Sequence, residues 1–482
     1  METKKAKALQ GIEQKREQLI ALSDAIWDHP EIRYTEYASM ELLCQFLEKE
    51  GFTVEKGIAN IPTAFRATFG SGHPFMGFLG EYDALDGLSQ KPGITHPEAL
   101  VPGGKGHGCG HNLLGTGCVA AAMGVKAYLE ENHLSGTVIF FGCPAEEGGS
   151  GKSFMAQDGV FDGLDMAFSW HPEAWNEVLA GGSLANHQVL YEFYGKASHA
   201  SGAPEKGRSA LDAVQLMDTG VEYLREHMID AARIHYAILD AGGKSPNVVP
   251  PFASVLYLIR APRNEQVQEL NDRVDEIAQG AALMTRTRVE KKFIKACSSL
   301  MDNTVMEEAL QKNLEGIERE AYTPEELELA HALSASAGGQ KMDLEKLLEN
   351  YDRSHRAEVR KLLAPYAKAT VNDFIMPLKD RENMLKASTD VSWICPCAIF
   401  TVATWPAGVT PHTWQAASLG KSTFAQKGMF FAGKVMAGTA IDFLEHPEML
   451  EHAKEELKSR VGEQGYVAPI PAHVKPQIPE KH

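Results

Sequence analysis

Hydrophobic and polar residues follow two different patterns along this chain. In residues 7–50 the apolar positions lie three and four apart, which predicts two helices. From there to residue 185, short apolar segments alternate with longer helical ones, including a predicted helix over 113–132. Strands that alternate with helices are typical of a mostly parallel sheet between layers of helices, an α/β fold. The expected strands include TAFRATF, FMGFLGEYDAL and GTVIFFGCP.

The pattern changes near residue 186. HQVLYEFYG alternates apolar and polar residues, as a strand with one solvated side does. A helix, two strands, a second helix over 266–284 and a last strand follow, which predicts a compact α+β unit of ordinary domain size. We therefore expect one discontinuous domain formed by residues 1–185 and 296–482, and a second domain formed by residues 186–295 inserted into it. Residues 304–385 are expected to be helical and highly charged.

Composition narrows the function classes. The net charge of −17 argues against a nucleic-acid surface and against an anionic membrane partner. The apolar run over 113–125 is too short to span a bilayer, and the charged N-terminus lacks the apolar core of a secretion signal. Seven cysteines, an odd number scattered over 482 residues, fit reduced thiols better than a disulfide framework. We expect a cytoplasmic protein.

The segment GGKGHGCGHN, residues 103–112, is the first candidate for chemistry. Its spacing fits neither of the glycine patterns that bind phosphate, because no glycine falls three places after Gly106 or Gly108 and no Lys-Ser/Thr pair follows. The loop places Cys109 and His111 two residues apart, directly before a predicted helix. A thiolate and an imidazole in one turn are suitable transition-metal ligands, and a helix N-terminus and a nearby cation lower a thiol pKa. A purely structural role is the alternative for such a pair taken alone.

Three further clusters follow predicted strands or turns, where an α/β sheet presents its functional loops. PAEEGGSGK carries the adjacent carboxylates Glu146 and Glu147, FSWHPE carries His171, and VTPHTWQ carries His412. Each has an ordinary alternative, a solvated acidic turn or a core histidine. Together, however, the clusters supply five ligands, which suits two metal ions better than one tetrahedral site. The expected ligands are Cys109, His111, Glu147, His171 and His412, with a sixth oxygen from Glu146, Asp83 or Asp390.

The motifs resemble those of the M20 metallopeptidase and amidohydrolase superfamily. Within it, the chain is similar to the amidohydrolase branch that includes aminoacylases and hydrolases of auxin conjugates. The resemblance covers nearly the whole chain in order, and the combination is specific although no single motif is. It rests on IWDHPEIRYTE, LGEYDAL, GHGCGHNLLG, GCPAEEGGSGK, WHPE, GRSALDAV, SPNVVP, LIRAP and PHTWQ.

This resemblance implies a zinc-peptidase-like catalytic domain that is interrupted by a lid domain, through which the chain forms a homodimer. It implies two divalent metal ions, manganese or zinc. Cys109 would bridge them, and His111, Glu147, His171 and His412 would complete the sites. Glu146 would be the general base of a metal-dependent amide hydrolysis.

The resemblance also assigns roles in the lid. His199 would reach a catalytic centre, often that of the partner, and Asn247 and Arg260 would hold the substrate. The expected substrate is an N-acyl or N-aroyl amino acid, with p-aminobenzoyl-glutamate as the first candidate. A general aminoacylase, a dipeptidase or an auxin-conjugate hydrolase remain alternatives. A related second subunit is a further expectation for the assembly, and the helical 304–385 segment would shape substrate choice or hold such a partner.

Two departures from the family pattern stand out. The loop STDVSW, residues 388–393, is shorter than in relatives, which puts the equivalence of Asp390 with a family aspartate in doubt. Cys395 and Cys397 form a second Cys-x-Cys pair, for which two small buried residues on a strand are the favoured interpretation. The altered loop keeps open a non-catalytic, metal-binding scaffold as a rival function.

Overall fold

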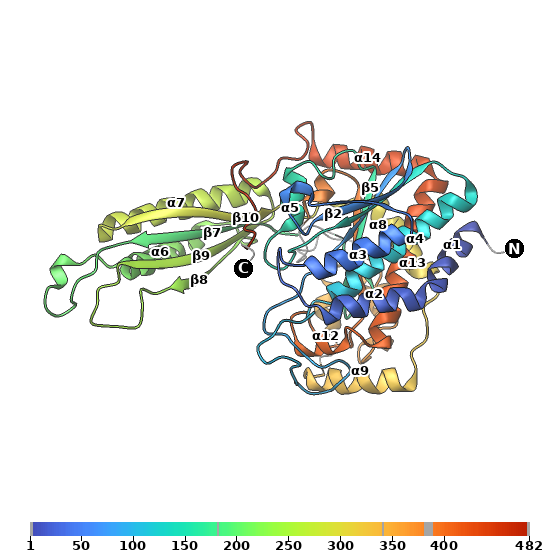
Figure 1. Cartoon of the computed structure of the whole chain (residues 1–482), viewed down its shortest axis with the longest axis horizontal. Helices are drawn as coiled ribbons and strands as arrows, with labels where there is room; N and C mark the ends of the chain where they lie inside the picture. The colour runs from blue at the N-terminus through green and yellow to red at the C-terminus, as the bar shows by residue number, and fades with distance from the viewer. Residues whose placement is uncertain (1–2, 181–182, 340–341, 380–388, 480–482) are drawn as a thin grey trace.

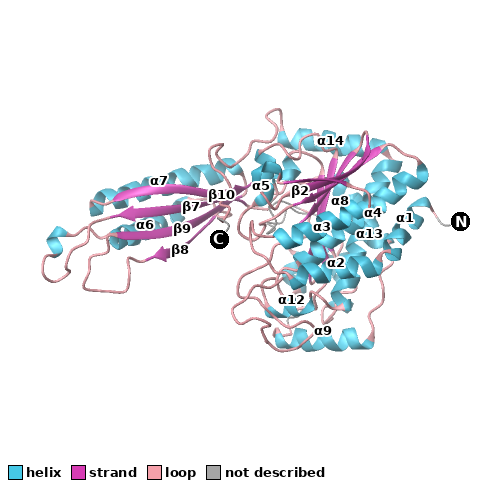
Figure 2. Ribbon diagram, viewed as in Figure 1, coloured by secondary structure: helices cyan, strands magenta, loops and turns pink. Residues whose placement is uncertain are grey.

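The computed structural model describes residues 3–180, 183–339, 342–379 and 389–479, and they form two sheets with separate sets of helices. The larger sheet and most helices form a broad lobe, and the smaller sheet projects from it as an elongated arm (Figures 1 and 2). The small sheet and its helices extend from Ala185 to Cys297. These limits lie next to the expected 186–295, while the division into domains itself stays a prediction.

The large sheet has the strand order β1-β2-β4-β3-β5-β11-β6. Its four central strands, β4, β3, β5 and β11, are parallel to one another, and the outer pairings are antiparallel. The carboxyl ends of the parallel strands therefore meet at one edge of the sheet, where ligands bind in folds of this class. The strands are β1 (Thr53–Lys56), β2 (Phe65–Ser71), β3 (Phe75–Gly80), β4 (Gly136–Gly142), β5 (Met166–Glu173), β6 (Glu177–Val178) and β11 (Cys397–Ala403).

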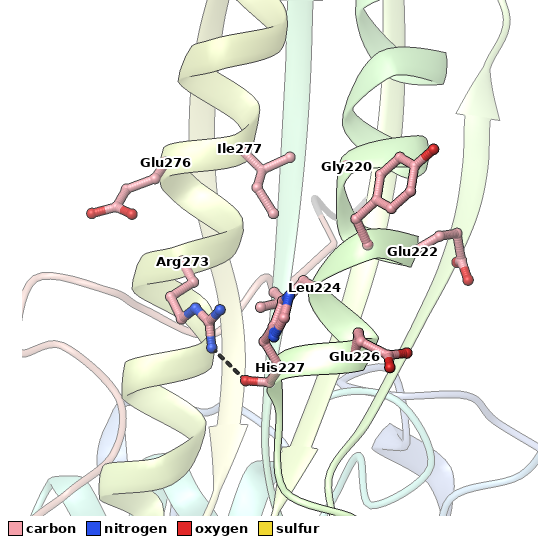
Figure 3. A pocket seen from close by; sticks show the side chains of 9 residues that line it. Gly220, Glu222, Leu224, Glu226, His227, Arg273, Glu276 and Ile277 are labelled. Carbon is pink, nitrogen blue, oxygen red and sulfur yellow. Dashed lines mark hydrogen bonds between the residues drawn. The ribbon is translucent and has the colours of Figure 1, made fainter.

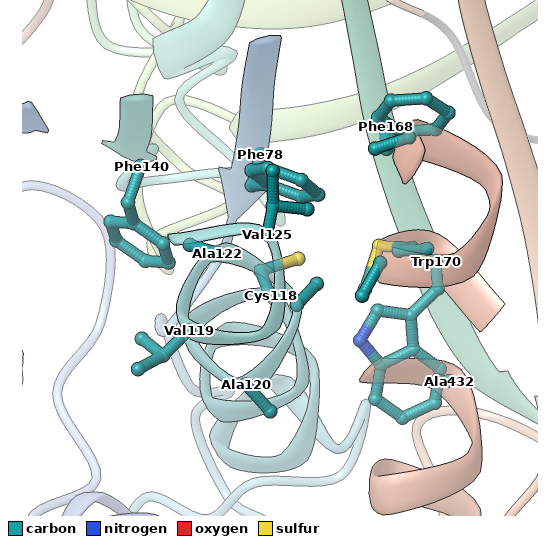
Figure 4. Packing of buried hydrophobic residues seen from close by; sticks show 14 of the residues in the cluster. Phe78, Cys118, Val119, Ala120, Ala122, Val125, Phe140, Phe168, Trp170 and Ala432 are labelled. Atoms are coloured by element: carbon teal, nitrogen blue, oxygen red, sulfur yellow. The ribbon is translucent and has the colours of Figure 1, made fainter. Parts of the chain in front are cut away.

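One face of this sheet is covered by α4 (His111–Asn132) and α13 (Thr423–Glu445), which pack against each other. Figure 4 shows Cys118 and Val119 of α4 packed among Phe78, Phe140 and Trp170 from three strands. Glycines allow this close approach, because a Cβ at Gly117 would lie 2.6 Å from the indole nitrogen of Trp170. Around them lie α1 (Lys4–Gln14), α2 (Arg16–Asp28), α3 (Tyr37–Lys49), α8 (Thr304–Gly316) and α14 (Pro447–Val461).

The opposite face of the large sheet carries a second apolar cluster, to which α5 (Gly151–Gln157) and the C-terminal segment contribute. Helices thus lie on both sides of a sheet whose centre is parallel, and the α/β fold class expected from the sequence is confirmed. The two helices expected over 7–50 are three, because Lys15 and the turn after Asp28 interrupt them.

The small sheet is antiparallel throughout, in the order β10-β7-β9-β8. The helices α6 (Ala210–Leu224) and α7 (Asn264–Thr285) pack on one face and enclose a separate apolar core. Strand β7 starts beside the lobe and β9 returns to it, since Ala185 pairs with Ala261. The strands are β7 (Ala185–Tyr194), β8 (Arg233–Asp240), β9 (Phe252–Ala261) and β10 (Arg288–Cys297).

Residues 304–385 are less helical than the sequence predicts. Beyond α8 the described part holds α9 (Pro324–Ser336), α10 (Leu344–Leu348) and α11 (Arg356–Leu363), and residues 367–379 form no helix. Bonds to the chain near the sheet replace helical ones, as when Asn176 donates from its side-chain amide to the carbonyls of Asn372 and Phe374. Residues 380–385 of the predicted segment lie outside the described residues. The remaining α-helix of the described residues is the short α12 (Trp414–Leu419), which precedes α13.

A search of the described helices for one with the length and apolar character of a bilayer span finds none.

We predict that Glu307→Gln stabilises the protein more at pH 8 than at pH 5. Glu307 of α8 is 8% exposed, and burial, with the nearby charge of Asp302, raises its pKa from 4.5 to about 8. Between these values the unfolded chain releases the proton before the folded chain does, so ionisation increasingly destabilises the fold as pH rises. Thermal unfolding of both proteins at the two pH values measures the effect. An equal difference in Tm at pH 5 and pH 8 would contradict it.

Candidate metal centre

The candidate ligands gather at the carboxyl edge of the parallel strands. Strand β3 ends at Gly80 and leads into Glu81 and Asp83, and β4 ends at Gly142 and leads into the loop with Glu146 and Glu147. His171 lies near the end of β5, and His111 is the first residue of α4. The topology therefore brings together side chains from widely separated parts of the sequence, as the strand-end argument predicts.

Cys109, His111 and His171 form the first group that can hold a cation. Their ligand atoms all lie within 4.8 Å of one another, and Cys109 Sγ is 3.4 Å from His171 Nε2. His171 Nδ1 donates to the carbonyl of Pro172 at 2.7 Å. With its proton on Nδ1, a neutral His171 presents the lone pair of Nε2 to the thiol side, which is the orientation of a metal ligand.

Cys109, Glu147 and His412 form the second group, with the same 4.8 Å limit. His412 Nε2 lies 3.1 Å from Glu147 Oε2. His412 has a φ of 64°, a left-handed conformation that is unfavourable for a residue other than glycine. Because Cys109 belongs to both groups, the geometry fits two neighbouring cations that share one sulfur.

Asp83 orients one ligand of each group. Its Oδ1 accepts a hydrogen bond from His111 Nδ1 at 2.9 Å, and its Oδ2 accepts one from the backbone N–H of Glu147 at 3.0 Å. A carboxylate that accepts from the distal nitrogen of a ligating histidine is a common support for metal sites. The structure therefore gives Asp83 an orienting position, and among the described residues Asp83 belongs to none of the metal-capable groups.

Two buried atoms of the cluster find no hydrogen-bond partner in the part of the chain that the structure describes, Nε2 of His111 and Oε1 of Glu147. His111 is completely buried, and its Nε2 is 3.3 Å from Glu81 Oε2 without the geometry of a hydrogen bond. Buried polar atoms without partners are rare and costly in folded proteins. A nitrogen, a carboxylate oxygen and a thiol that face one another in this state fit a pair of divalent cations.

The sequence did not point to Glu81 and Lys152. Glu81, His111 and Glu146 form a third group within 4.8 Å, and the buried ammonium of Lys152 pairs with Glu81. Burial opposes the charge of Lys152, but Glu81 outweighs it and raises the pKa of the ammonium. The two motifs that contain them, LGEYDAL and EEGGSGK, were noted, but nothing in their spacing indicated a pair.

Charges inside the cluster are strongly perturbed. Burial raises the pKa of the Cys109 thiol, so the expected lowering by the helix N-terminus does not prevail in the protein without a cation. Burial also opposes ionisation of Glu147, yet the hydrogen bond to His412 and the charge of His111 bring its pKa to about 2. That same bond raises the pKa of His412. A bound cation would supply the charge that a buried thiolate needs.

The three lid residues lie at opposite ends of the small sheet. His199 and Asn247 lie side by side beyond the outer end, where the backbone N–H of Ala200 donates to the carbonyl of Asn247 at 2.9 Å. Arg260 lies at the inner end of β9, opposite Asn186. Ten residues of β7 separate the ends, roughly 30 Å at 3.3 Å per residue. Within the described residues, one chain therefore does not bring Arg260 together with Asn247.

Asp390 belongs to no metal-capable group among the described residues. It is completely buried and accepts hydrogen bonds from the hydroxyls of Ser153, Ser298 and Tyr466 at 2.5, 2.6 and 3.0 Å. Its oxygens are thus occupied, and the sixth-ligand role considered for it finds no support. Cys395 and Cys397 are buried free thiols in the apolar cluster behind the sheet, as expected for a structural pair.

A groove of about 670 Å³ opens between α6 and α7, on the helical side of the small sheet (Figure 3). Four of its nine lining residues are charged, and Arg273 donates to the backbone carbonyl of His227 at 2.8 Å. No residue of the three metal-capable groups lines it. The groove is therefore a separate surface feature and offers none of the chemistry of the cluster.

Comparison with known proteins identifies relatives over almost the full length. The sequence profile of peptidase family M20/M25/M40 matches residues 77–412. The chain is 45% identical to the p-aminobenzoyl-glutamate hydrolase subunit designated B from Escherichia coli K12, over 96% of this chain and 97% of that protein.

Two solved structures share the fold. One is a protein from methicillin resistant Staphylococcus aureus described as an aminohydrolase, with a TM-score of 0.63 and 15% identity over 92% of this chain and 100% of that one. The other is a dinuclear metal binding peptidase of the M20 family from Bacillus subtilis, with a TM-score of 0.51 and 16% identity over 90% and 99%.

We predict that Cys109→Ala lowers the amount of divalent cation bound per chain, because both groups lose their shared ligand. Cation content after dialysis, measured by inductively coupled plasma mass spectrometry, gives the result. Cys395→Ala is the matched control, since it removes an equally buried thiol outside the cluster and should leave the content unchanged. Equal cation content in wild type and Cys109→Ala would exclude the bridging role.

Proposed function

We propose that this chain, which belongs to peptidase family M20/M25/M40, hydrolyses the amide bond of an N-acyl amino acid. The chain is an amidohydrolase of that family. The observation that carries the proposal is the pair of ligand groups that share Cys109, with Glu146 outside both but within 4.8 Å of His111 in the third group. Such an arrangement leaves one carboxylate free for proton transfer while the others bind cations.

Five side chains would hold two divalent cations, manganese or zinc: Cys109, His111, His171, Glu147 and His412. When bound, these cations would polarise the scissile carbonyl and acidify water. The mixed set of sulfur, nitrogen and oxygen donors suits either metal. The dinuclear site of the Bacillus subtilis relative supports a count of two.

Glu146 is the proposed proton carrier. It accepts the proton of the attacking water and delivers it to the amine nitrogen, so that the C–N bond breaks to leave a carboxylate and an amine. Its neighbour Glu147 points into the second ligand group. His412 Nε2 pairs with the carboxylate of Glu147, and Asp83 accepts a hydrogen bond from the backbone N–H of Glu147. Adjacent residues on a tight loop therefore divide the two tasks.

The preferred substrate candidate is p-aminobenzoyl-glutamate. The support is 45% identity to the Escherichia coli hydrolase subunit over nearly the whole of both chains. A guanidinium binds a carboxylate in a bidentate manner, so Arg260 at the inner end of the small sheet is suited to hold the glutamate part. Residues 186–295 would act as the lid over this site.

The lid residues support a homodimer. The length of β7, roughly 30 Å, separates His199 from the inner end of its own sheet. A second chain is therefore the simplest source of His199 and Asn247 at each site. Strand β8 pairs only with β9 among the described strands and exposes Tyr236, Ile238 and Leu239 by 40, 44 and 58%. An apolar edge strand of this kind pairs readily with another chain.

A related second subunit would use the same edge, and the naming of the Escherichia coli relative as one subunit of a hydrolase favours such a partner. We place the protein in the cytoplasm, because its seven cysteines are free thiols and five of the six outside the metal cluster are buried.

We predict that Glu146→Gln abolishes turnover, by at least about 100-fold, while cation content stays near that of wild type, because Glu146 serves proton transfer. The assay is amine release from a panel of N-acyl amino acids that includes p-aminobenzoyl-glutamate, a dipeptide and an indoleacetyl-amino acid. Apo protein is supplied with manganese or zinc in separate reactions. Retained turnover in Glu146→Gln removes it as the base, and an inactive wild type with every substrate and metal supports the scaffold alternative.

We predict that two inactive variants restore each other when co-expressed. If His199 serves the partner's site, a dimer of one His199→Ala chain and one Glu146→Gln chain has one complete site. The purified mixed dimer should then have about half of wild-type activity, and a randomly paired mixture about a quarter. Activity is measured on the mixed dimer purified through two different tags. Mixed dimers that are as inactive as the single variants would show that His199 acts, if at all, within its own chain.

A further inference from the structure

The turn between α2 and α3 packs directly against the loop that carries Glu146 and Glu147. We call residues 31–36, EIRYTE, the N-terminal turn, and residues 143–150, CPAEEGGS, the carboxylate loop. The N-terminal turn belongs to a motif of the sequence that neither the metal groups nor the proton-transfer step uses. Two of its side chains bond to the backbone of the carboxylate loop.

Glu36 holds the start of the carboxylate loop. It is completely buried, its Oε1 accepts from the backbone N–H of Ala145 at 2.9 Å, and its Oε2 accepts from the hydroxyl of Thr63 at 3.0 Å. Within the described residues, no lysine, arginine or histidine forms an ion pair with it. A buried acidic group without a cationic partner is costly to ionise, and burial raises the pKa of Glu36 to about 8, so its retention calls for a geometric reason.

Tyr34 holds the end of the same loop. Its buried hydroxyl donates to the carbonyl of Gly149 at 2.8 Å. The ring lies so close that a Cβ at Gly149 would come within 2.6 Å of it. Tyr34 itself has a φ of 62°, which is unfavourable for an aromatic residue and which the surrounding contacts must maintain.

The carboxylate loop is strained at both ends. Ala145 has a φ of 60° and Ser150 a φ of 55°, both in the left-handed region. Between them the Gly149 N–H donates to the Ala145 carbonyl at 2.9 Å, which closes a tight turn over residues 145–149. Glu146 and Glu147 therefore project from a strained turn that is bonded to Glu36 at one end and to Tyr34 at the other.

We propose that Glu36 is a positioning residue for the two carboxylates, with Tyr34 as its counterpart at the other end of the loop. Glu36 keeps Ala145 in its left-handed conformation and thereby fixes where Glu146 and Glu147 point. This inference rests on the proposed function, since it assigns to Glu36 the placement of the proton carrier and of one cation ligand. Small displacements of such groups cost up to about 100-fold in rate.

Three variants test the role, and two more serve as controls. Glu36→Ala removes both acceptors, whereas Glu36→Gln keeps an amide oxygen for the Ala145 N–H and an amide N–H for the Thr63 hydroxyl. Tyr34→Phe removes only the bond to Gly149. Glu307→Ala is the control for loss of a buried glutamate far along the chain, and Tyr128→Phe is the control for loss of a buried tyrosine hydroxyl, whose partner is Glu445 at 2.6 Å.

Three readouts are compared: kcat and KM for the substrate found active in the panel, the affinity for added manganese or zinc, and amide hydrogen exchange of a peptide that contains residues 144–150. For Glu36→Ala we expect kcat to fall by about 100-fold and KM to change by less than about threefold. We expect weaker binding of one cation and faster exchange in the 144–150 peptide. Glu36→Gln should restore all of these, and Tyr34→Phe should show a smaller loss of the same kind. The two controls should leave the three readouts unchanged.

Three outcomes would overturn the proposal: wild-type kcat and exchange in Glu36→Ala, equal impairment in Glu36→Gln and Glu36→Ala, or equal effects of Glu307→Ala. If Glu36→Ala does not fold, Glu36→Gln and Tyr34→Phe test the proposal instead. Amide exchange in the 144–150 peptide must then be faster than in wild type for Tyr34→Phe and unchanged for Glu36→Gln. An inactive wild type would refute the proposed function, but exchange and cation affinity would still test the placement of the loop by Glu36.

Discussion

The carboxylate of Asp83 is the contact on which the centre depends. It is 1% exposed, and its two oxygens fix groups from two different chain segments, His111 on α4 and the backbone of Glu147 after β4. One short side chain at the end of β3 thereby sets the relative position of the first and the second ligand group. The bond to His111 Nδ1 also fixes which nitrogen of the ring faces the cluster. If this carboxylate were lost, the ligand groups would remain on neighbouring strands, but no single side chain would hold His111 and Glu147 in their relative positions.

Most of the fold and of the ligand cluster could be predicted from sequence because both follow from local patterns. Strands such as GTVIFFGCP are recognisable, and parallel strands deliver their carboxyl ends to one edge, so Cys109, Glu147 and His171 were expected to meet there. The role of Asp390 was not predictable in this way. Its partners Ser153, Ser298 and Tyr466 come from three distant segments, and only tertiary packing shows that they occupy its oxygens.

Other features were missed for the same reason. The ion pair of Glu81 and Lys152 and the bonds from Glu36 and Tyr34 to the carboxylate loop join segments that no periodicity connects. The helical expectation for 304–385 failed differently. Charged residues with apolar ones between them favour helix locally, but the polypeptide after Leu363 forms its bonds with the chain near β5 and β6 instead. Tertiary contacts outweighed local propensity there.

The site also shows how strain and burial are concentrated where chemistry is expected. Tyr34, Ala145, Ser150 and His412 all adopt left-handed backbone conformations at or beside the carboxylates. Together with the unpartnered Nε2 of His111 and Oε1 of Glu147, they describe a region that is stable only when its neighbours hold it in place. The arm of residues 185–297 extends away from the lobe that holds this region (Figure 1).

The central claim is that two cations share Cys109. Anomalous diffraction from crystals of the protein loaded with manganese or zinc, collected on both sides of the metal absorption edge, tests it most directly. We expect two anomalous peaks per chain, both within bonding distance of Cys109 Sγ, one beside His111 and His171 and the other beside Glu147 and His412. A single peak that does not touch the sulfur, or peaks outside these five side chains, would contradict it.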